Sequence, residues 1–155
     1  MVDIDSTDKD NRQTFDDSIQ LNELPKFRNS KYINKATKYV NHHFKNNIGN
    51  TNNFIFPITH NNAIRWLNHF ISNNLEQFGT YQDAFNTEHD NMFHSILSSS
   101  LNIGLINPNG IIEQLREVKN KVPINSLEGY VRQLCWREFQ RYCYIWSVYD
   151  VNTLM

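Results

Sequence analysis

The stretch LEGYVRQLCWREFQRYCYIWSVY, residues 127–149, decides the fold of this chain. Its apolar residues recur at helical spacing, and its aromatic residues fall on most faces of the helix that they predict. Asn125 and Ser126 are suitable residues for the start of that helix. A helix that is apolar nearly all round is normally covered on more than one side. We therefore expect a long helix whose cover is completed by a partner or by a further segment.

Upstream of this stretch, the spacing of apolar residues predicts shorter amphipathic helices. One covers Tyr32–Phe44. The next follows Thr59, a good N-cap residue, and Gly79 is placed to close it. A third covers Ile111–Val122 and is stopped by Pro123. Because no strand-like alternation of useful length and no repeat is present, the predicted fold class is all-α.

Length and composition indicate one soluble domain. The chain has 155 residues, is 39% hydrophobic and 13% aromatic, and carries a net charge of −1. It therefore lacks the overall basic excess that usually accompanies nucleic-acid binding. Residues 1–20 are polar and charged and predict a flexible leader or linker remnant, followed by the folded part, 21–155. The bias towards Asn and Ile indicates an AT-rich genome, a viral one included.

The sequence predicts neither a membrane segment nor a metal site. No secretory signal opens the chain and no apolar run approaches the roughly 20 residues that span a bilayer, so we expect a cytoplasmic or nuclear protein. Cys135 and Cys143 fit no zinc or iron–sulfur spacing and are expected to be buried thiols. The six histidines form no ligand set, and common nucleotide-binding and hydrolase motifs are missing.

Two segments carry residues that are suited to binding. In residues 92–108, Ser95 and Ser98 lie between apolar anchors, where hydroxyls and free backbone N–H groups could bind an anion. The alternative is an ordinary helix cap. Gly104 would allow another backbone to approach closely.

The second segment is residues 128–139. Gln133, Trp136 and Arg137 lie within about a turn and a half of helix, and together an amide, an indole and a guanidinium suit a flat heterocycle. The alternative is an amphipathic helix with a buried Trp136 and a surface Arg–Glu pair. The pattern by itself favours this alternative.

Together these segments resemble the photolyase/cryptochrome family, and most closely its prokaryotic (6-4) photolyase, or photolyase-related, group. YVRQLCWREF at 130–139 is similar to the W-x-R-E-L-x-W-R-E-F helix of that family. HSILS at 94–98 resembles its T-S-x-L-S phosphate-binding turn. FPITHNNA at 56–63, FGTYQDA at 78–84 and VPINSLEGYVRQ at 122–133 follow the prokaryotic group in order and spacing.

The resemblance implies the front portion of a helical FAD-binding domain, which ends before that domain is complete. It implies cofactor-binding roles for seven residues: Tyr81, His94, Ser95, Leu97, Ser98, Asn102 and Arg137. It implies that Gln133 and Trp136 face the cavity that receives a flipped-out lesion. The family's iron–sulfur cluster is not expected in this chain, because neither Cys135 nor Cys143 matches a cluster position.

The activity implied by the resemblance is light-driven repair of (6-4) photoproducts in damaged DNA, a carbon–carbon lyase reaction in which FAD supplies the electron. We expect this chain to be inactive alone and to bind FAD weakly or not at all. One alternative is a complementation module that assembles with a second polypeptide carrying the rest of the flavin site. Another is an independent small helical protein that has lost the chemistry.

Overall fold

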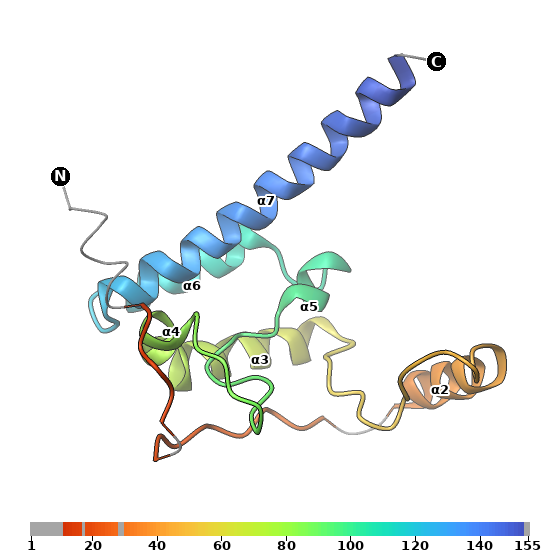
Figure 1. The fold of residues 1–155 in the computed structure, drawn as a ribbon, viewed down its shortest axis with the longest axis horizontal. Coiled ribbons are helices and arrows are strands. Elements are labelled where there is room, and N and C mark those ends of the chain that lie inside the picture. Colours follow the sequence, from red (N-terminus) through yellow and green to blue (C-terminus); the bar gives the residue numbers. More distant parts are fainter. Residues whose placement is uncertain (1–10, 17, 28–29, 154–155) are drawn as a thin grey trace.

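The computed structural model describes residues 11–16, 18–27 and 30–153, and over these residues it confirms the all-α prediction. Figure 1 shows how the helices follow one another, with both the shortest and the longest among them in the second half of the chain. The helices are α2 (Lys31–His43), α3 (His60–Asn73), α4 (Leu75–Tyr81), α5 (Ser98–Asn102), α6 (Pro108–Val118) and α7 (Ile124–Thr153).

Side-chain caps explain where three of the helices begin. The Thr59 hydroxyl accepts a hydrogen bond from the Asn62 N–H at 3.3 Å, as predicted for the start of α3. Ser30 caps α2 in the same way. Asn107 caps α6 and is followed by a proline at the first helical position, where a missing N–H costs nothing.

Gly79 was predicted to close a helix, but it lies inside α4. The chain breaks instead at buried Asn74, which separates α3 from α4. A Cβ atom on Gly79 would lie 2.4 Å from the backbone nitrogen of Ser126. The glycine is therefore present because α4 and α7 meet backbone to backbone.

Pro123 and Ser126 have roles that differ from the predicted ones. The third amphipathic helix, α6, ends at Val118, and Pro123 precedes the first residue of α7, where its carbonyl accepts from the Leu127 N–H. The Ser126 hydroxyl accepts from the Gly79 N–H and donates to the Glu76 carbonyl, both at 2.8 Å. It therefore fastens α7 to α4.

The core lies where α3 and α4 meet the first half of α7 (Figure 1). Phe70 and Phe78 pack their rings on Tyr130, with centroids 4.6 and 5.4 Å apart. Trp66 is 1% exposed and Leu75 fully buried. These aromatic residues, together with buried leucines and Ile111, form the core that holds the helices together.

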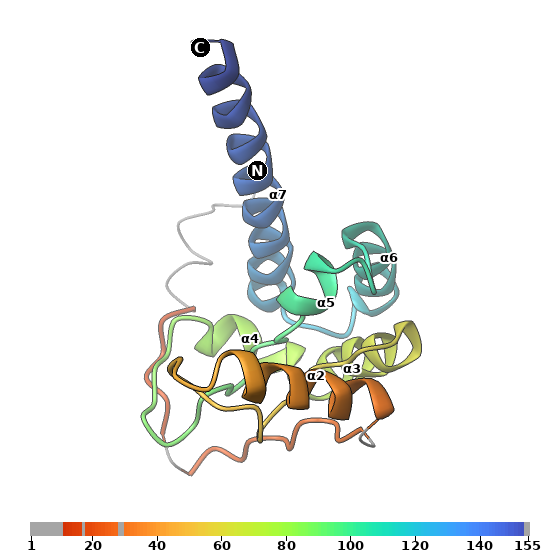
Figure 2. The ribbon, with the colours of Figure 1, turned by 90° about the vertical axis from the view of Figure 1, so that its right-hand side faces the viewer.

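The second half of α7 extends away from the other helices, as Figure 2 shows. Its large apolar side chains are exposed: Phe139, Tyr142, Tyr144, Ile145, Trp146 and Val148. Cys135 and Cys143 are exposed as well, so the prediction of buried thiols was wrong. Both cysteines lie on the side of α7 opposite to Tyr130 and Leu134, which is the side that enters the core.

Residues 1–10 and 17 of the predicted leader lie outside the described residues. Of the rest, Phe15 is buried against Met92 and Phe93, and the Gln13 N–H donates to the Thr80 carbonyl at 3.2 Å. Phe15, the Gln13 hydrogen bond and the buried Asn11 thus hold residues 11–16 on the body of the protein. The domain boundary at residue 20 stays a prediction. Among the described helices, none is both long and apolar enough to cross a membrane.

Candidate functional site: a cavity between α5 and α7

A cavity of about 580 Å³ lies between α5 and the middle of α7. Its size falls within the range of small-molecule sites. Its lining is mostly polar on the α5 side and mixed on the α7 side: Ser98, Asn102, Arg137, Gln140, Arg141, Tyr144 and Ile145. The cavity is therefore suited to a ligand with a polar, hydrogen-bonding part.

Arg137 joins the two walls of this cavity. Its Nη2 atom donates to the Asn102 Oδ1 atom at 2.8 Å, and its side chain is only 18% exposed. Within the described part of the protein, its buried Nε atom has no hydrogen-bond partner. Glu138 pairs with both Arg137 and Arg141, which leaves the three side chains with one net positive charge. Guanidinium groups held in this way favour carboxylate or phosphate ligands.

The geometry of α7 explains why these side chains share the cavity. Arg137, Arg141 and Tyr144 are spaced by four and three residues and so lie along one side of the helix. Further back, the same side carries Tyr130 and Leu134, which are buried in the core. The side that packs in the first half of the helix therefore lines the cavity in the second half.

The turn that precedes α5 has an unusual backbone. Ile96 has φ +53° and Met92 has φ +40°, although β-branched residues such as isoleucine rarely adopt positive φ. Leu97, which follows Ile96, is 1% exposed in the core, and Ser98 reaches the cavity. Strain of this kind persists where the surrounding contacts over-determine the turn.

The serines of this turn do not act as the helix cap that the sequence allowed. Position Leu97 precedes α5 without a side-chain cap bond. In the part of the chain that is described, the buried Ser99 and Ser100 hydroxyls have no hydrogen-bond partner. The Ser95 side chain hydrogen-bonds to Tyr130, and its carbonyl accepts from the Trp66 indole N–H at 2.8 Å. Ser95 thus ties the turn to both α3 and α7.

Burial raises the pKa of Tyr130 from 10.0 to about 12, against the opposing effect of its hydrogen bond to Ser95. Tyr130 remains a neutral hydrogen-bonding group throughout the physiological pH range. The pKa of Tyr130 is higher in the folded protein than in the unfolded chain. The stability that its buried neutral hydroxyl contributes is therefore complete below pH 10. It is lost as the pH rises towards 12.

We therefore expect the free energy of unfolding to fall between pH 10 and 12, by up to about 1.4 kcal/mol per pH unit from Tyr130. Urea unfolding at several pH values measures this slope. The variant Tyr130→Phe should lose roughly 1 kcal/mol at pH 8 and fall less steeply above pH 10. Equal slopes for the native protein and Tyr130→Phe would contradict the view that Tyr130 causes this pH dependence.

The structure brings three of the predicted cofactor residues, Ser98, Asn102 and Arg137, to one cavity. Ser95 does not line this cavity and lies three residues before Ser98 in the sequence. Leu97 is in the core, and two other side chains contact aromatic neighbours: Tyr81 stacks on Phe93 at 5.4 Å, and His94 meets the edge of Phe78 at 5.7 Å. Burial lowers the pKa of His94, opposed by nearby Asp83, although part of the ring reaches solvent. Their roles stay predictions.

Gln133 and Trp136 are both exposed on α7. Gln133 lies one turn before Arg137 on the same side of the helix. Trp136 is 52% exposed, so it is not the buried tryptophan of the alternative interpretation. With Arg132, Cys135 and Phe139 it lines a separate shallow hollow on another side of α7. Gln133 therefore lies on the same side of α7 as the cavity without lining it, whereas Trp136 and Arg137 border different spaces.

Sequence reasoning missed the far end of the cavity. Gln140, Arg141, Tyr144 and Ile145 line it, and the helical repeat from Arg137 could have indicated them. Gly104 also differs from expectation. A Cβ atom there would meet nothing within 4 Å, so its φ of +75° and not a close backbone approach explains the glycine.

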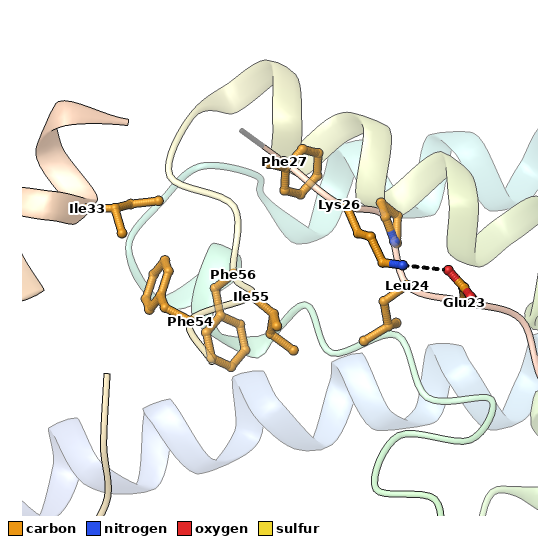
Figure 3. Close-up of a pocket in the computed structure, with 9 residues that line it drawn as sticks. Glu23, Leu24, Lys26, Phe27, Ile33, Phe54, Ile55 and Phe56 are labelled. Carbon is orange, nitrogen blue, oxygen red and sulfur yellow. Dashed lines mark hydrogen bonds and ion pairs between the residues drawn. The ribbon is translucent and has the colours of Figure 1, made fainter. Parts of the chain in front are cut away.

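Elsewhere the described residues form hollows with more apolar linings, and one of them, between α2 and residues 50–59, has a similar volume of about 580 Å³. Among the described residues, no group of three His, Cys, Asp or Glu could hold a metal ion. A second hollow lies between Glu23–Phe27, Ile33 and Phe54–Phe56. Figure 3 shows that its lining is apolar apart from Lys26 and Glu23, which pair with each other at 2.7 Å. It presents no cluster of polar groups that would orient a ligand.

Comparison with known proteins identifies relatives of this chain. Residues 6–56 match the family described as deoxyribodipyrimidine photo-lyase-related protein. The chain is 32% identical over 140 residues to the (6-4) photolyase of Agrobacterium fabrum. It is 40% identical over 67 residues to uncharacterized protein R853 of Acanthamoeba polyphaga mimivirus.

The chain therefore belongs to the photolyase-related family. Among the relatives compared, the (6-4) photolyase match covers 88% of this chain but 28% of that enzyme. The match to R853 covers 41% of this chain and 52% of the viral protein. The chain thus spans little more than a quarter of the length of the photolyase it matches.

Proposed function

We propose that this chain forms one wall of a photolyase-type flavin site and acts together with a second polypeptide that supplies the other walls. The observation that carries the proposal is the Arg137–Asn102 hydrogen bond across a cavity whose α7 side continues into exposed aromatic residues. The Arg137 guanidinium group at the cavity suits an anionic cofactor. The exposed aromatic residues on α7 suit a helix that other elements cover.

The residues present fit the diphosphate part of FAD. Arg137 and Arg141 supply charged donors, and Ser98 and Asn102 supply neutral ones. The buried Nε atom of Arg137 has no partner among the described residues, so a further acceptor would satisfy it. The flat rings of a flavin need apolar walls, of which this chain supplies Tyr144 and Ile145. Bound FAD would supply light-driven electron transfer, and these side chains would hold and orient it.

For the assembled protein we propose repair of (6-4) photoproducts in damaged DNA, with Gln133 and Trp136 facing the lesion. This part of the proposal is supported by the 32% identity to the Agrobacterium fabrum (6-4) photolyase. It is also supported by the exposed amide of Gln133, which lies one turn before Arg137 on the same side of α7 and could hydrogen-bond to a flipped-out base.

The experiment compares flavin binding by this chain alone and by this chain with a second polypeptide. The second polypeptide is the Agrobacterium fabrum enzyme without the stretch that matches this chain. Quenching of flavin fluorescence reports binding, and repair of an oligonucleotide with a (6-4) lesion under blue light reports activity. We expect weak or no binding and no repair by the chain alone, and a gain of both when the two are mixed.

Matched variants then test the cavity itself. In the mixture, Arg137→Gln and Arg141→Gln should each weaken FAD binding by about 10-fold or more, because a charge-assisted hydrogen bond is lost. Arg116→Gln, on an exposed side of α6, removes the same charge elsewhere and should leave binding unchanged. Tight FAD binding and repair by this chain alone would refute the need for a second polypeptide. Indifference to both α7 substitutions would refute the placement of the diphosphate.

A further inference from the structure

The charges of this chain are divided unevenly along the sequence. Residues 24–75 contain seven lysines and arginines and no aspartate or glutamate, although the whole chain has 15 basic and 16 acidic residues. The net charge of −1 therefore conceals a segment with seven positive charges. A segment of one sign attracts a partner of the other sign.

Helix α2 arranges part of this charge as a line. Lys31, Lys35 and Lys38 are spaced by four and three residues, and His42 continues the series, so all four lie along one side of the helix. All are exposed. Within the described part of the chain, none of these lysines forms an ion pair. The line of positive charge is thus open to a partner.

Two exposed tyrosines flank the line. Tyr32 is 66% exposed and Tyr39 is 58% exposed, and a spacing of seven residues places them along the same side of α2. The Lys31 ammonium lies 5.2 Å from the centre of the Tyr32 ring. The Tyr39 ring lies 4.3 Å from that of His43. The helix therefore presents a row of cations beside a row of aromatic faces.

The opposite side of α2 is turned towards the rest of the protein. Ile33, Ala36 and Val40 line a largely apolar hollow against Phe54 and Phe56. In Figure 3, Ile33 of α2 and Phe54 lie on neighbouring edges of the adjoining hollow. Because the apolar side borders this hollow, the lysine line and Tyr39 face solvent, and Tyr32 lies at the rim of the hollow with 66% of its surface exposed.

We propose that this surface of α2, defined by Lys31, Lys35, Lys38, Tyr32 and Tyr39, binds single-stranded nucleic acid without regard to lesion or flavin. The lysines match a phosphate backbone, and exposed rings beside them match unpaired bases, on whose faces they can stack. An acidic peptide would use the lysines but not the rings. In a duplex the bases are stacked on one another, so the tyrosines of this convex helix could not reach their faces. The inference does not depend on the proposed function.

The test measures fluorescence anisotropy of a labelled oligothymidylate of about 20 nucleotides, in the dark and without FAD, over a range of salt concentrations. We expect the full chain to bind, with affinity falling as salt rises. The triple variant K31Q/K35Q/K38Q should reduce the slope of log affinity against log salt by about 2. The double variant Y32L/Y39L should weaken binding by roughly 10-fold at one salt concentration while leaving the slope unchanged.

A matched control keeps the test specific. R116Q/K119Q/K121Q removes three exposed charges around the end of α6 and should leave both affinity and slope unchanged. Circular dichroism confirms that each variant is folded. Three results would overturn the proposal: no binding by the native chain, equal losses from the control, or Y32L/Y39L binding as tightly as the native chain. In the last case, equal binding of polyglutamate would identify the surface as a site for acidic peptides.

Discussion

Replacing Gly79 with alanine is expected to lower the free energy of unfolding by about 3 kcal/mol or more, one of the two largest losses that we predict for a single substitution. The added Cβ atom would lie 2.4 Å from the Ser126 nitrogen and 2.6 Å from the Asn125 carbonyl carbon and the Ser126 Cα atom. All three are backbone atoms, so no side chain can move aside. The helices α4 and α7 would have to separate, which would also break the hydrogen bond from the Gly79 N–H to Ser126.

Two other glycines provide controls in the same urea-unfolding experiment. At Gly110, in α6, a Cβ atom would lie 3.6 Å from Asn107 Oδ1, an ordinary contact. Gly110→Ala should therefore be neutral or stabilise by up to about 1 kcal/mol, because alanine favours a helix. At Gly129 the close atom is the end of the Gln82 side chain, and an intermediate loss is expected. A Gly79→Ala midpoint equal to that of Gly110→Ala would contradict the backbone contact.

Replacing Trp66 with alanine is expected to cost about 3–5 kcal/mol, the range for a large aromatic residue removed from a core. Trp66 is 1% exposed and packs beside Phe27, with ring centroids 5.8 Å apart. Its indole N–H also holds the Ser95 carbonyl. The substitution should therefore loosen the turn that carries Ser98 to the cavity, in addition to lowering stability.

The variants Trp66→Phe and Trp146→Ala separate these effects. Phenylalanine retains most of the apolar volume but leaves the Ser95 carbonyl without its donor, so a smaller loss, roughly 1–3 kcal/mol, is expected. Trp146 is 68% exposed on α7, and its removal should change stability by less than about 0.5 kcal/mol. Urea midpoints and near-ultraviolet circular dichroism measure all three. A Trp146→Ala loss as large as that of Trp66→Ala would mean that the exposed half of α7 is covered in solution.

Local patterns predicted the helices well where a cap or a strong apolar period was present. Tyr32–Phe44 and the long final helix agree with α2 and α7 to within a few residues, and Thr59 caps α3. The errors fall on Gly79 and Pro123. Both residues are common at helix ends, and at Gly79 a contact with a helix 47 residues away overrode the local tendency.

Only part of the candidate site could be predicted from the sequence, because the cavity also depends on how the helices are placed in space. Ser98, Asn102 and Arg137 were implied by resemblance, and the structure gathers them in one cavity. Trp136 and Arg137 are adjacent in sequence, but a helix turns by about 100° per residue, so they border different spaces. The lysine line of α2 was present in the sequence but was hidden by a nearly neutral total charge.

The sequence by itself determined that the chain is all-α, that it resembles photolyases, and where α2, α3 and α7 begin. These follow from local periodicity, from caps and from motifs that need no knowledge of distant contacts. Only the tertiary structure decided that α4 and α7 meet backbone to backbone, that Ser95 joins the turn to Tyr130 and Trp66, and that half of α7 stands uncovered. The physical reason is that burial depends on which residues come into contact in the folded chain. Contacts between residues far apart in the sequence leave no local pattern from which they could be predicted.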